Sequence, residues 1–207
     1  MLDDILNFIF PTSCIACEEP SDTNGLQLCS KCTLLVPKEL RDLGESSLIE
    51  ERWALASYDS PLGIALRKAK FGKDIVLMQN LAKALSEGVR HSGKLKMNTV
   101  THVPTSLRRE FFRGFDQAEV LAHEVAHSLQ VPHCRLLKRL DSTEQSTKSL
   151  DERITDPVQF KAIGMATEVL IVDDVCTSGG SLEAAAQELL MHGVKKVKAL
   201  TLLSRQI

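Results

Sequence analysis

The sequence lacks the features that mark several classes of protein. Only 4% of its 207 residues are aromatic, with one Trp and one Tyr, and the net charge is −2. A charge this small excludes a histone-like polycation and a chain kept unfolded by self-repulsion. No stretch approaches the roughly 18 uncharged apolar residues of a membrane span. Six cysteines are too few and too unevenly spread for a small secreted disulfide scaffold.

The composition is otherwise that of a globular protein, with 43% hydrophobic residues. The opening MLDDILNFIF carries acids where a secretory signal peptide has basic residues, so we expect a cytoplasmic protein with reduced thiols. The charge is unevenly distributed. Residues 61–115 carry eleven basic and three acidic side chains, a net charge of +8. This segment is a candidate surface for an anionic partner, although solvated lysines on helix faces give the same pattern.

Four of the cysteines form two CxxC pairs, Cys14 with Cys17 and Cys29 with Cys32. Two such pairs separated by a short, turn-rich loop suit a tetrahedral structural zinc site. The alternative is a redox pair, but redox CxxC motifs usually occur singly and open a helix beside a βαβ unit. We therefore predict structural zinc bound by these four thiolates.

Apolar periodicity predicts that strands alternate with helices from residue 51 onward. Strands are expected over 51–59, 98–103, 168–172 and 197–203, and helices over 61–71, 74–90, 116–130 and 181–192. This alternation is typical of a parallel α/β sheet. We expect a cysteine module with its connector over 1–50 and an α/β domain over 51–207. Residues 141–153 show no periodicity and are interpreted as a loop.

The most informative stretch is an apolar strand that leads into Asp173 and Asp174, then a polar turn, then a helix. Ligands bind at the carboxyl ends of strands in open α/β sheets. Gly179 and Gly180 let backbone N–H groups approach a ligand, and the following helix directs its positive end to the same place. The hydroxyl donors of the turn are Thr177, Ser178 and Ser181. The turn predicts a phosphate site and the acids predict bonds to hydroxyls, so a sugar phosphate fits both.

This stretch resembles the PRPP-binding motif of type I phosphoribosyltransferases, in which Asp-Asp precedes a Thr-Thr-Gly-type turn. The chain as a whole resembles the ComF/ComFC family of competence-associated proteins. The resemblance is carried by the four-cysteine module, by LRKAKFG at 66–72, by VPTS at 103–106 and by RGFDQA at 113–118. Asp116 stands where the family usually has Asn. The resemblance implies a type I phosphoribosyltransferase-like parallel sheet flanked by helices, preceded by a small zinc-binding module.

The resemblance also implies roles for individual residues. Asp173 and Asp174 would contact the ribose of PRPP, and residues 177–181 would hold its 5′-phosphate. The expected pyrophosphate loop comprises Thr105, Ser106 and Arg108. Mg²⁺ would be bound together with the diphosphate. Residues 107–113 are interpreted as a short basic loop, and the further candidates for phosphate or DNA contacts are Lys70, Lys73, Arg109 and Arg113.

Three functions follow from the residues and the resemblance. The first is a cytoplasmic competence factor that handles incoming single-stranded DNA during natural transformation and binds PRPP. The second is an active phosphoribosyltransferase that releases pyrophosphate from PRPP onto a nitrogen nucleophile. The third is a non-catalytic adaptor for a DNA helicase or a recombination factor. Because bases stack on aromatic side chains, the phenylalanines of the basic segment bear on the first function, but most of them are expected to lie in the core. They are Phe71, Phe111, Phe112 and Phe115.

One further motif, HEVAH at 123–127, matches the HExxH pattern of zinc proteases. Spacing i, i+4 places His123 and His127 on one face of a helix. Both lie off the apolar stripe, and no motif supplies a third ligand, so we interpret them as exposed side chains.

Overall fold

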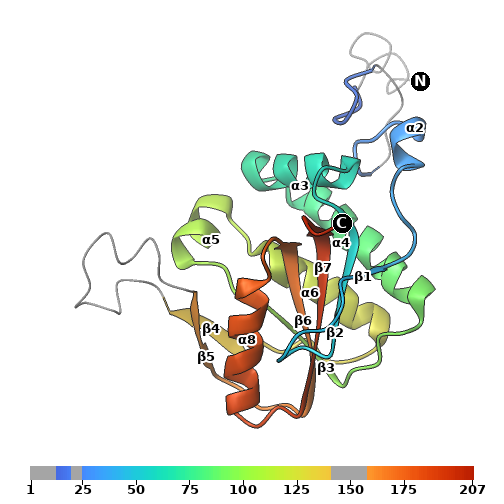
Figure 1. The fold of residues 1–207 in the computed structure, drawn as a ribbon. Helices are drawn as coiled ribbons and strands as arrows, with labels where there is room; N and C mark the ends of the chain where they lie inside the picture. The colour runs from blue at the N-terminus through green and yellow to red at the C-terminus, as the bar shows by residue number, and fades with distance from the viewer. Residues whose placement is uncertain (1–12, 20–24, 141–157) are drawn as a thin grey trace.

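The computed structural model describes residues 13–19, 25–140 and 158–207 (Figure 1). Its centre is a five-stranded sheet in the order β1–β2–β7–β6–β3. The strands are β1 (Arg41–Asp42), β2 (Glu51–Ser57), β3 (Thr99–His102), β6 (Glu168–Cys176) and β7 (Lys196–Ser204). The two-residue β1 pairs antiparallel with β2, and the other pairings are parallel. The carboxyl ends of the four parallel strands therefore meet at one edge.

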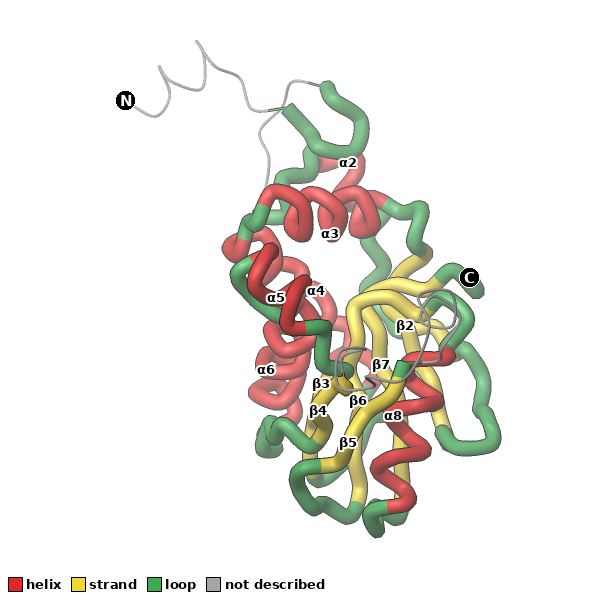
Figure 2. The backbone as a smooth tube through the Cα atoms, turned by 90° about the vertical axis from the view of Figure 1, so that its left-hand side faces the viewer, coloured by secondary structure: helices red, strands yellow, loops and turns green. Residues whose placement is uncertain are grey.

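Helices cover both faces of this sheet (Figure 2). The first face is covered by α3 (Pro61–Gly72), α4 (Ile75–Ser92) and α6 (Gln117–Leu129), and the second by α8 (Gly180–Met191). A separate hairpin of β4 (Leu137–Leu140) and β5 (Gln159–Ala162) lies beside α8. The two short helices are α2 (Ser30–Thr33) and α5 (Leu107–Arg113).

The expected parallel α/β architecture is confirmed, and each expected strand and helix is present within a few residues of its predicted bounds. Three features differ. Strand β6 extends through the acid pair to Cys176, residues 107–113 form helix α5 instead of a loop, and the β4–β5 hairpin was not expected. The loop predicted over 141–153 lies outside the described residues.

Strand β6 shows why the sheet needs helices on both sides. Its apolar residues alternate between two clusters: Leu170 and Val172 pack with α3, α4 and α6, whereas Val169 and Ile171 pack with α8. All four are fully buried. A strand buried on both faces has a continuous apolar sequence without polar alternation, which is the pattern at 169–172.

The cysteine module packs against the helical layer and is joined to it by polar contacts. Ile15, Leu26 and Val36 pack against the core that contains α3 and α4. The Gln27 amide donates to the Asp74 carboxylate at 3.1 Å, and the Asn80 amide donates to the Gly25 carbonyl at 2.8 Å. Asp74 also caps the N-terminus of α4 through the Leu77 N–H. The module is therefore attached where α4 begins. Among the described residues, no helix is long and apolar enough to cross a membrane.

Helix α3 lies close to the end of β2 because Gly63 has no side chain. A Cβ at this position would fall 1.9 Å from the Tyr58 carbonyl oxygen. This close approach brings α3 over the carboxyl edge of the sheet.

We predict that Gly63→Ala destabilises the protein by more than about 2 kcal/mol, because backbone must move to relieve the overlap. Gly72→Ala is the matched control, since nothing lies within 4 Å of its Cβ position. The control should be neutral or slightly stabilising. Urea unfolding of both variants measures the difference, and equal stabilities would contradict this account of how α3 is placed.

Candidate functional site

A polar cavity of about 250 Å³ lies at the carboxyl edge of the sheet. Residues from α3, β6 and the segments that follow β3 and β6 line it. The predicted site residues that it brings together are Lys70, Thr105, Arg109, Arg113, Asp173, Asp174, Thr177 and Ser181. Positions separated by about a hundred residues in sequence thus share one cavity, because the parallel strands end at the same edge.

The floor of the cavity contains the acid pair and a lysine. Lys70 Nζ lies 2.5 Å from Asp174 Oδ2, and both side chains are about one-sixth exposed, at 15% and 17%. Lys70 was expected as a contact for phosphate or DNA; in the structure it is paired with the second acid. An ion pair shielded from water is stronger than a surface pair. Lys70 therefore links α3 to the end of β6 and reduces the negative charge there.

Asp173 is in a different environment from Asp174. Burial of its carboxyl group and the adjacent charge of Asp174 raise the pKa of Asp173 well above its ordinary value. The Asp174 N–H, which donates to Asp173 Oδ1 at 2.7 Å, and the charge of Lys70 oppose this shift. Two adjacent carboxyl groups at the end of a strand can form hydrogen bonds with vicinal hydroxyls, which suits a sugar ring.

The turn after β6 leads directly into α8. Gly179 is the N-cap of α8 with φ of +88°, a conformation that side-chain-bearing residues rarely adopt. A Cβ there would lie 3.4 Å from a guanidinium nitrogen of Arg52. Thr177 and Ser181 line the cavity, whereas Ser178, Gly179 and Gly180 form the backbone of the turn next to it. The free N–H groups at the start of α8 are thus brought to the cavity wall.

The segment after β3 is held by Asp116. One oxygen of this buried carboxylate accepts the Thr105 N–H at 2.8 Å, and the other accepts the Ala118 N–H at 3.0 Å, capping α6. Burial raises the pKa of Asp116, and the hydrogen bond from Thr105 opposes that shift. Thr105 was expected in the pyrophosphate loop, and in the structure its N–H is bonded to Asp116. Thr105 itself still lines the cavity.

Helix α5 presents the basic residues that were expected in a loop. Arg109 and Arg113 are one turn apart and both line the polar cavity. Arg113 also donates to the Gln117 side chain at 2.6 Å. Ser106 and Arg108 line an adjacent cavity of about 700 Å³ instead. Lys73 lies outside both cavities, with its Nζ 4.7 Å from the centre of the Phe112 ring.

Several residues that line the polar cavity were assigned no role from the sequence, among them Asp116, Gln117 and Arg139. Gln117 belongs to the RGFDQA segment but was assigned no role, and Arg139 lies on β4, which was not expected. The Arg139 side chain lines the adjacent cavity as well. A four-residue strand carries too little periodicity to be recognised, so no sequence signal placed Arg139 here.

The four cysteines of the N-terminal module form a compact cluster. Their Sγ atoms all lie within 4.8 Å of one another, and three of the four residues are buried. Burial raises the pKa of Cys14, but hydrogen bonds from the Cys29 and Cys17 backbone outweigh it and bring the pKa to about 6. Burial and a hydrogen bond with Cys29 raise the pKa of Cys32 to about 12. Four thiolates cannot share this space without a cation, and the all-sulfur donor set fits zinc.

The HExxH residues do not form a second cluster. His123 and His127 are exposed on α6, as expected. Over the residues that the structure describes, the four cysteines are the one group of three or more His, Cys, Asp or Glu side chains close enough to share an ion.

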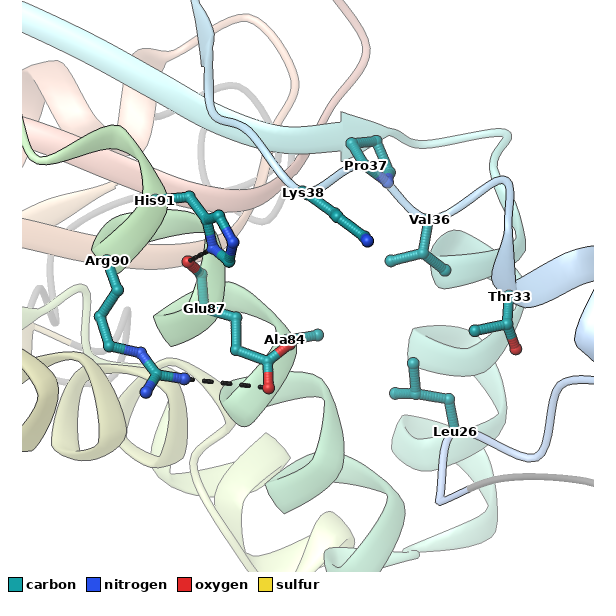
Figure 3. Close-up of a pocket in the computed structure, with 9 residues that line it drawn as sticks. All are labelled: Leu26, Thr33, Val36, Pro37, Lys38, Ala84, Glu87, Arg90 and His91. Atoms are coloured by element: carbon teal, nitrogen blue, oxygen red, sulfur yellow. Dashed lines mark hydrogen bonds and ion pairs between the residues drawn. The ribbon is translucent and has the colours of Figure 1, made fainter.

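A larger cavity, of about 760 Å³, lies between the cysteine module and α4 (Figure 3). Leu26, Val36 and Ala84 give it an apolar lining, and a chain of contacts joins Arg90 and His91 to Glu87 at its rim. It contains neither a carboxylate pair nor the hydroxyl-rich turn. The acid pair and the hydroxyl-bearing turn lie instead at the smaller polar cavity.

The fold and this cavity define a class of protein. The phosphoribosyl transferase domain family matches residues 116–207, from the start of α6 to the end of the chain. The matched region holds both the acid pair and the turn before α8. Residues 116–207 are thus similar to a phosphoribosyl transferase domain, and a four-cysteine cluster lies N-terminal to them.

The curated relatives extend the similarity toward the N-terminus. Competence protein ComFC of Bacillus subtilis is 27% identical over 87% of this chain and 72% of the relative. Competence protein F of Haemophilus influenzae is 24% identical over 89% of this chain and 87% of the relative. DNA utilization protein YhgH of Salmonella typhimurium is 24% identical over 84% and 82%, respectively. These similarities confirm the resemblance to the ComF/ComFC family that the motifs indicate.

Because the pKa of Asp173 is raised in the folded protein, the contribution of this residue to stability should depend on pH. A carboxyl group whose pKa is raised on folding stabilises the fold below its ordinary pKa, and this contribution is lost as pH rises through the folded-state value. Asp173→Asn, which does not titrate, should therefore raise the melting temperature at about pH 8, and the gain should shrink toward zero near pH 4. Each unit of pKa rise corresponds to about 1.4 kcal/mol. Glu45→Gln, at an exposed acid, should show no such trend. A gain in melting temperature that is the same at every pH would contradict the raised pKa of Asp173.

For the cysteine cluster we predict one zinc ion per chain by elemental analysis. Cys32→Ser should lose the ion and lower the melting temperature by at least about 5 °C, because metal binding contributes to the stability of the folded module. His123→Ala should retain both the zinc and the melting temperature. A second equivalent of zinc that depends on His123 would contradict the assignment of the four cysteines as the sole site.

Proposed function

We propose that the protein is a cytoplasmic competence factor that binds PRPP with Mg²⁺ and handles single-stranded DNA during natural transformation. The observation that carries this proposal is the polar cavity, which is lined by the acid pair of β6, by Thr177 and Ser181 of the turn before α8, and by Arg109 and Arg113. The printed names of the relatives, which include competence and DNA utilization proteins, support the biological setting.

The cavity offers both carboxylates and guanidinium groups, as a ribose phosphate offers both hydroxyls and phosphates. Asp173 and Asp174 would accept hydrogen bonds from the ribose hydroxyls. Thr177, Ser181 and the N–H groups at the start of α8 would hold the 5′-phosphate. Arg109 and Arg113 would contact the diphosphate, for which a guanidinium offers two parallel hydrogen bonds.

The residues present fit a magnesium ion that is bound mainly through its substrate. Mg²⁺ prefers oxygen ligands and usually takes one or two carboxylates together with substrate phosphates. Asp173 and Asp174 are the carboxylates at hand, and Mg²⁺ would neutralise charge on the diphosphate. Lys70, whose ammonium group pairs with Asp174, would hold that side chain in place.

The test removes the acid pair. Asp173→Ala with Asp174→Ala should abolish PRPP binding by calorimetry in the presence of Mg²⁺, and should reduce transformation of the source organism at least tenfold when placed at the native locus. The matched control, Glu45→Ala with Glu50→Ala, removes the same charge from exposed positions and should behave as wild type. The purified variant must retain its zinc and must still unfold in a single cooperative transition.

Other outcomes would favour the other functions. Wild-type transformation by the double variant, in a strain where deletion of the gene abolishes transformation, would favour a non-catalytic adaptor for a helicase or recombination factor. Pyrophosphate release from PRPP that depends on an added nitrogen base would favour an active phosphoribosyltransferase. Normal transformation after deletion would reject the competence role.

A further inference from the structure

Helix α5 and the end of α3 expose three large aromatic side chains, contrary to the expectation that they lie in the core. Phe111 is 92% exposed, Phe71 73% and Phe112 63%. The fourth, Phe115, is partly buried and packs against the core, as expected. Helix α5 buries none of its residues. A cluster of exposed phenylalanines often marks a binding surface, whereas single exposed apolar residues are common on any protein.

The aromatic residues line a cavity together with arginines. The cavity of about 700 Å³ is lined by Phe71, Ser106, Arg108, Arg109, Phe111, Phe112, Arg113 and Arg139. We call this the α5 platform. Lys73 extends its positive charge, since its Nζ lies 4.7 Å from the centre of the Phe112 ring. Flat apolar rings beside guanidinium groups match a ligand that alternates flat bases with phosphates, which is the chemistry of a single strand of nucleic acid.

The α5 platform is not separate from the polar cavity. Arg109, Arg113 and Arg139 line both. A phosphate of a bound strand and the diphosphate of PRPP would therefore draw on the same three guanidinium groups. Two anions that share one set of cations weaken each other's binding, and the effect is reciprocal because it is a coupling free energy.

We propose that the α5 platform stacks the bases of single-stranded DNA, and that PRPP and the strand compete because they share Arg109, Arg113 and Arg139. This inference rests on the proposed function, to which it adds the DNA surface and its coupling to the PRPP site. PRPP would then act as a ligand that releases the strand, and the strand would lower the affinity for PRPP by the same factor.

The first experiment tests stacking. Full-length, zinc-loaded protein is titrated against fluorescein-labelled dT20, with binding followed by anisotropy at constant ionic strength. Phe111→Ala with Phe112→Ala should weaken binding tenfold or more, as expected for lost base stacking, and should leave PRPP affinity unchanged. Met165→Ala, at an apolar residue that is 91% exposed elsewhere, is the control and should bind as wild type. An abasic oligomer of the same length should bind wild type as weakly as dT20 binds the Phe variant.

The second experiment tests the coupling. Saturating PRPP with Mg²⁺ should weaken dT20 binding to wild type five- to tenfold at unchanged ionic strength, within the range of ordinary coupling between sites. Asp173→Ala with Asp174→Ala should still bind dT20 but lose its response to PRPP.

The outcomes separate the two levels of the proposal. If the Phe variant and the Met165→Ala control bind dT20 equally, the bases do not stack on α5 and the inference is wrong while the proposed function stands. If PRPP and dT20 bind independently, the shared arginines do not couple the two ligands and the proposed competition is wrong. If wild type binds PRPP but not dT20, both this inference and the DNA-binding part of the proposed function fail. If PRPP does not bind, the proposed function itself is rejected.

Discussion

Two adjacent carboxylates at the end of a buried strand need cations close by, and much of this structure follows from that requirement. Like charges on Asp173 and Asp174 repel one another, and burial adds to the cost. Lys70, on α3, reduces this cost, because its Nζ lies 2.5 Å from Asp174 Oδ2. Helix α3 can supply this lysine because Gly63 lets it approach the backbone at Tyr58. The packing of a helix and the charge of the site are thus parts of one arrangement.

The sequence predicted those parts of the site in which the fold itself requires a recognisable pattern of residues. Strand β6 is buried on both faces, so its apolar run is unmistakable, and Asp173 and Asp174 follow it directly. The turn before α8 needs Gly179 for its positive φ. In the same way, the spacing of the cysteines in two CxxC pairs brings four Sγ atoms within 4.8 Å of one another. In each case the chemistry is local in sequence.

The parts that the sequence did not predict lack such a pattern. Helix α5 packs no residue into the core, so it has no apolar stripe and was interpreted as a loop. Its phenylalanines were assigned to the core because an apolar residue is usually buried, whereas Phe111 is almost fully exposed. Arg139 reaches the cavity only because β4 folds beside the main sheet. Asp116 takes the Thr105 N–H, a contact between positions eleven residues apart that no spacing rule specifies.

Because α5 buries no side chain, the fold places few demands on its sequence. Substitutions in the core are limited by packing, but those on α5 alter the surface that meets a ligand at little cost in stability. The acid pair, by contrast, is held by β6 and by the ion pair with Lys70, and the turn is held between β6 and α8. Under the proposed function, a lineage of such proteins can therefore change what α5 recognises while the acid pair and the turn stay the same, so that new specificity evolves without a new fold.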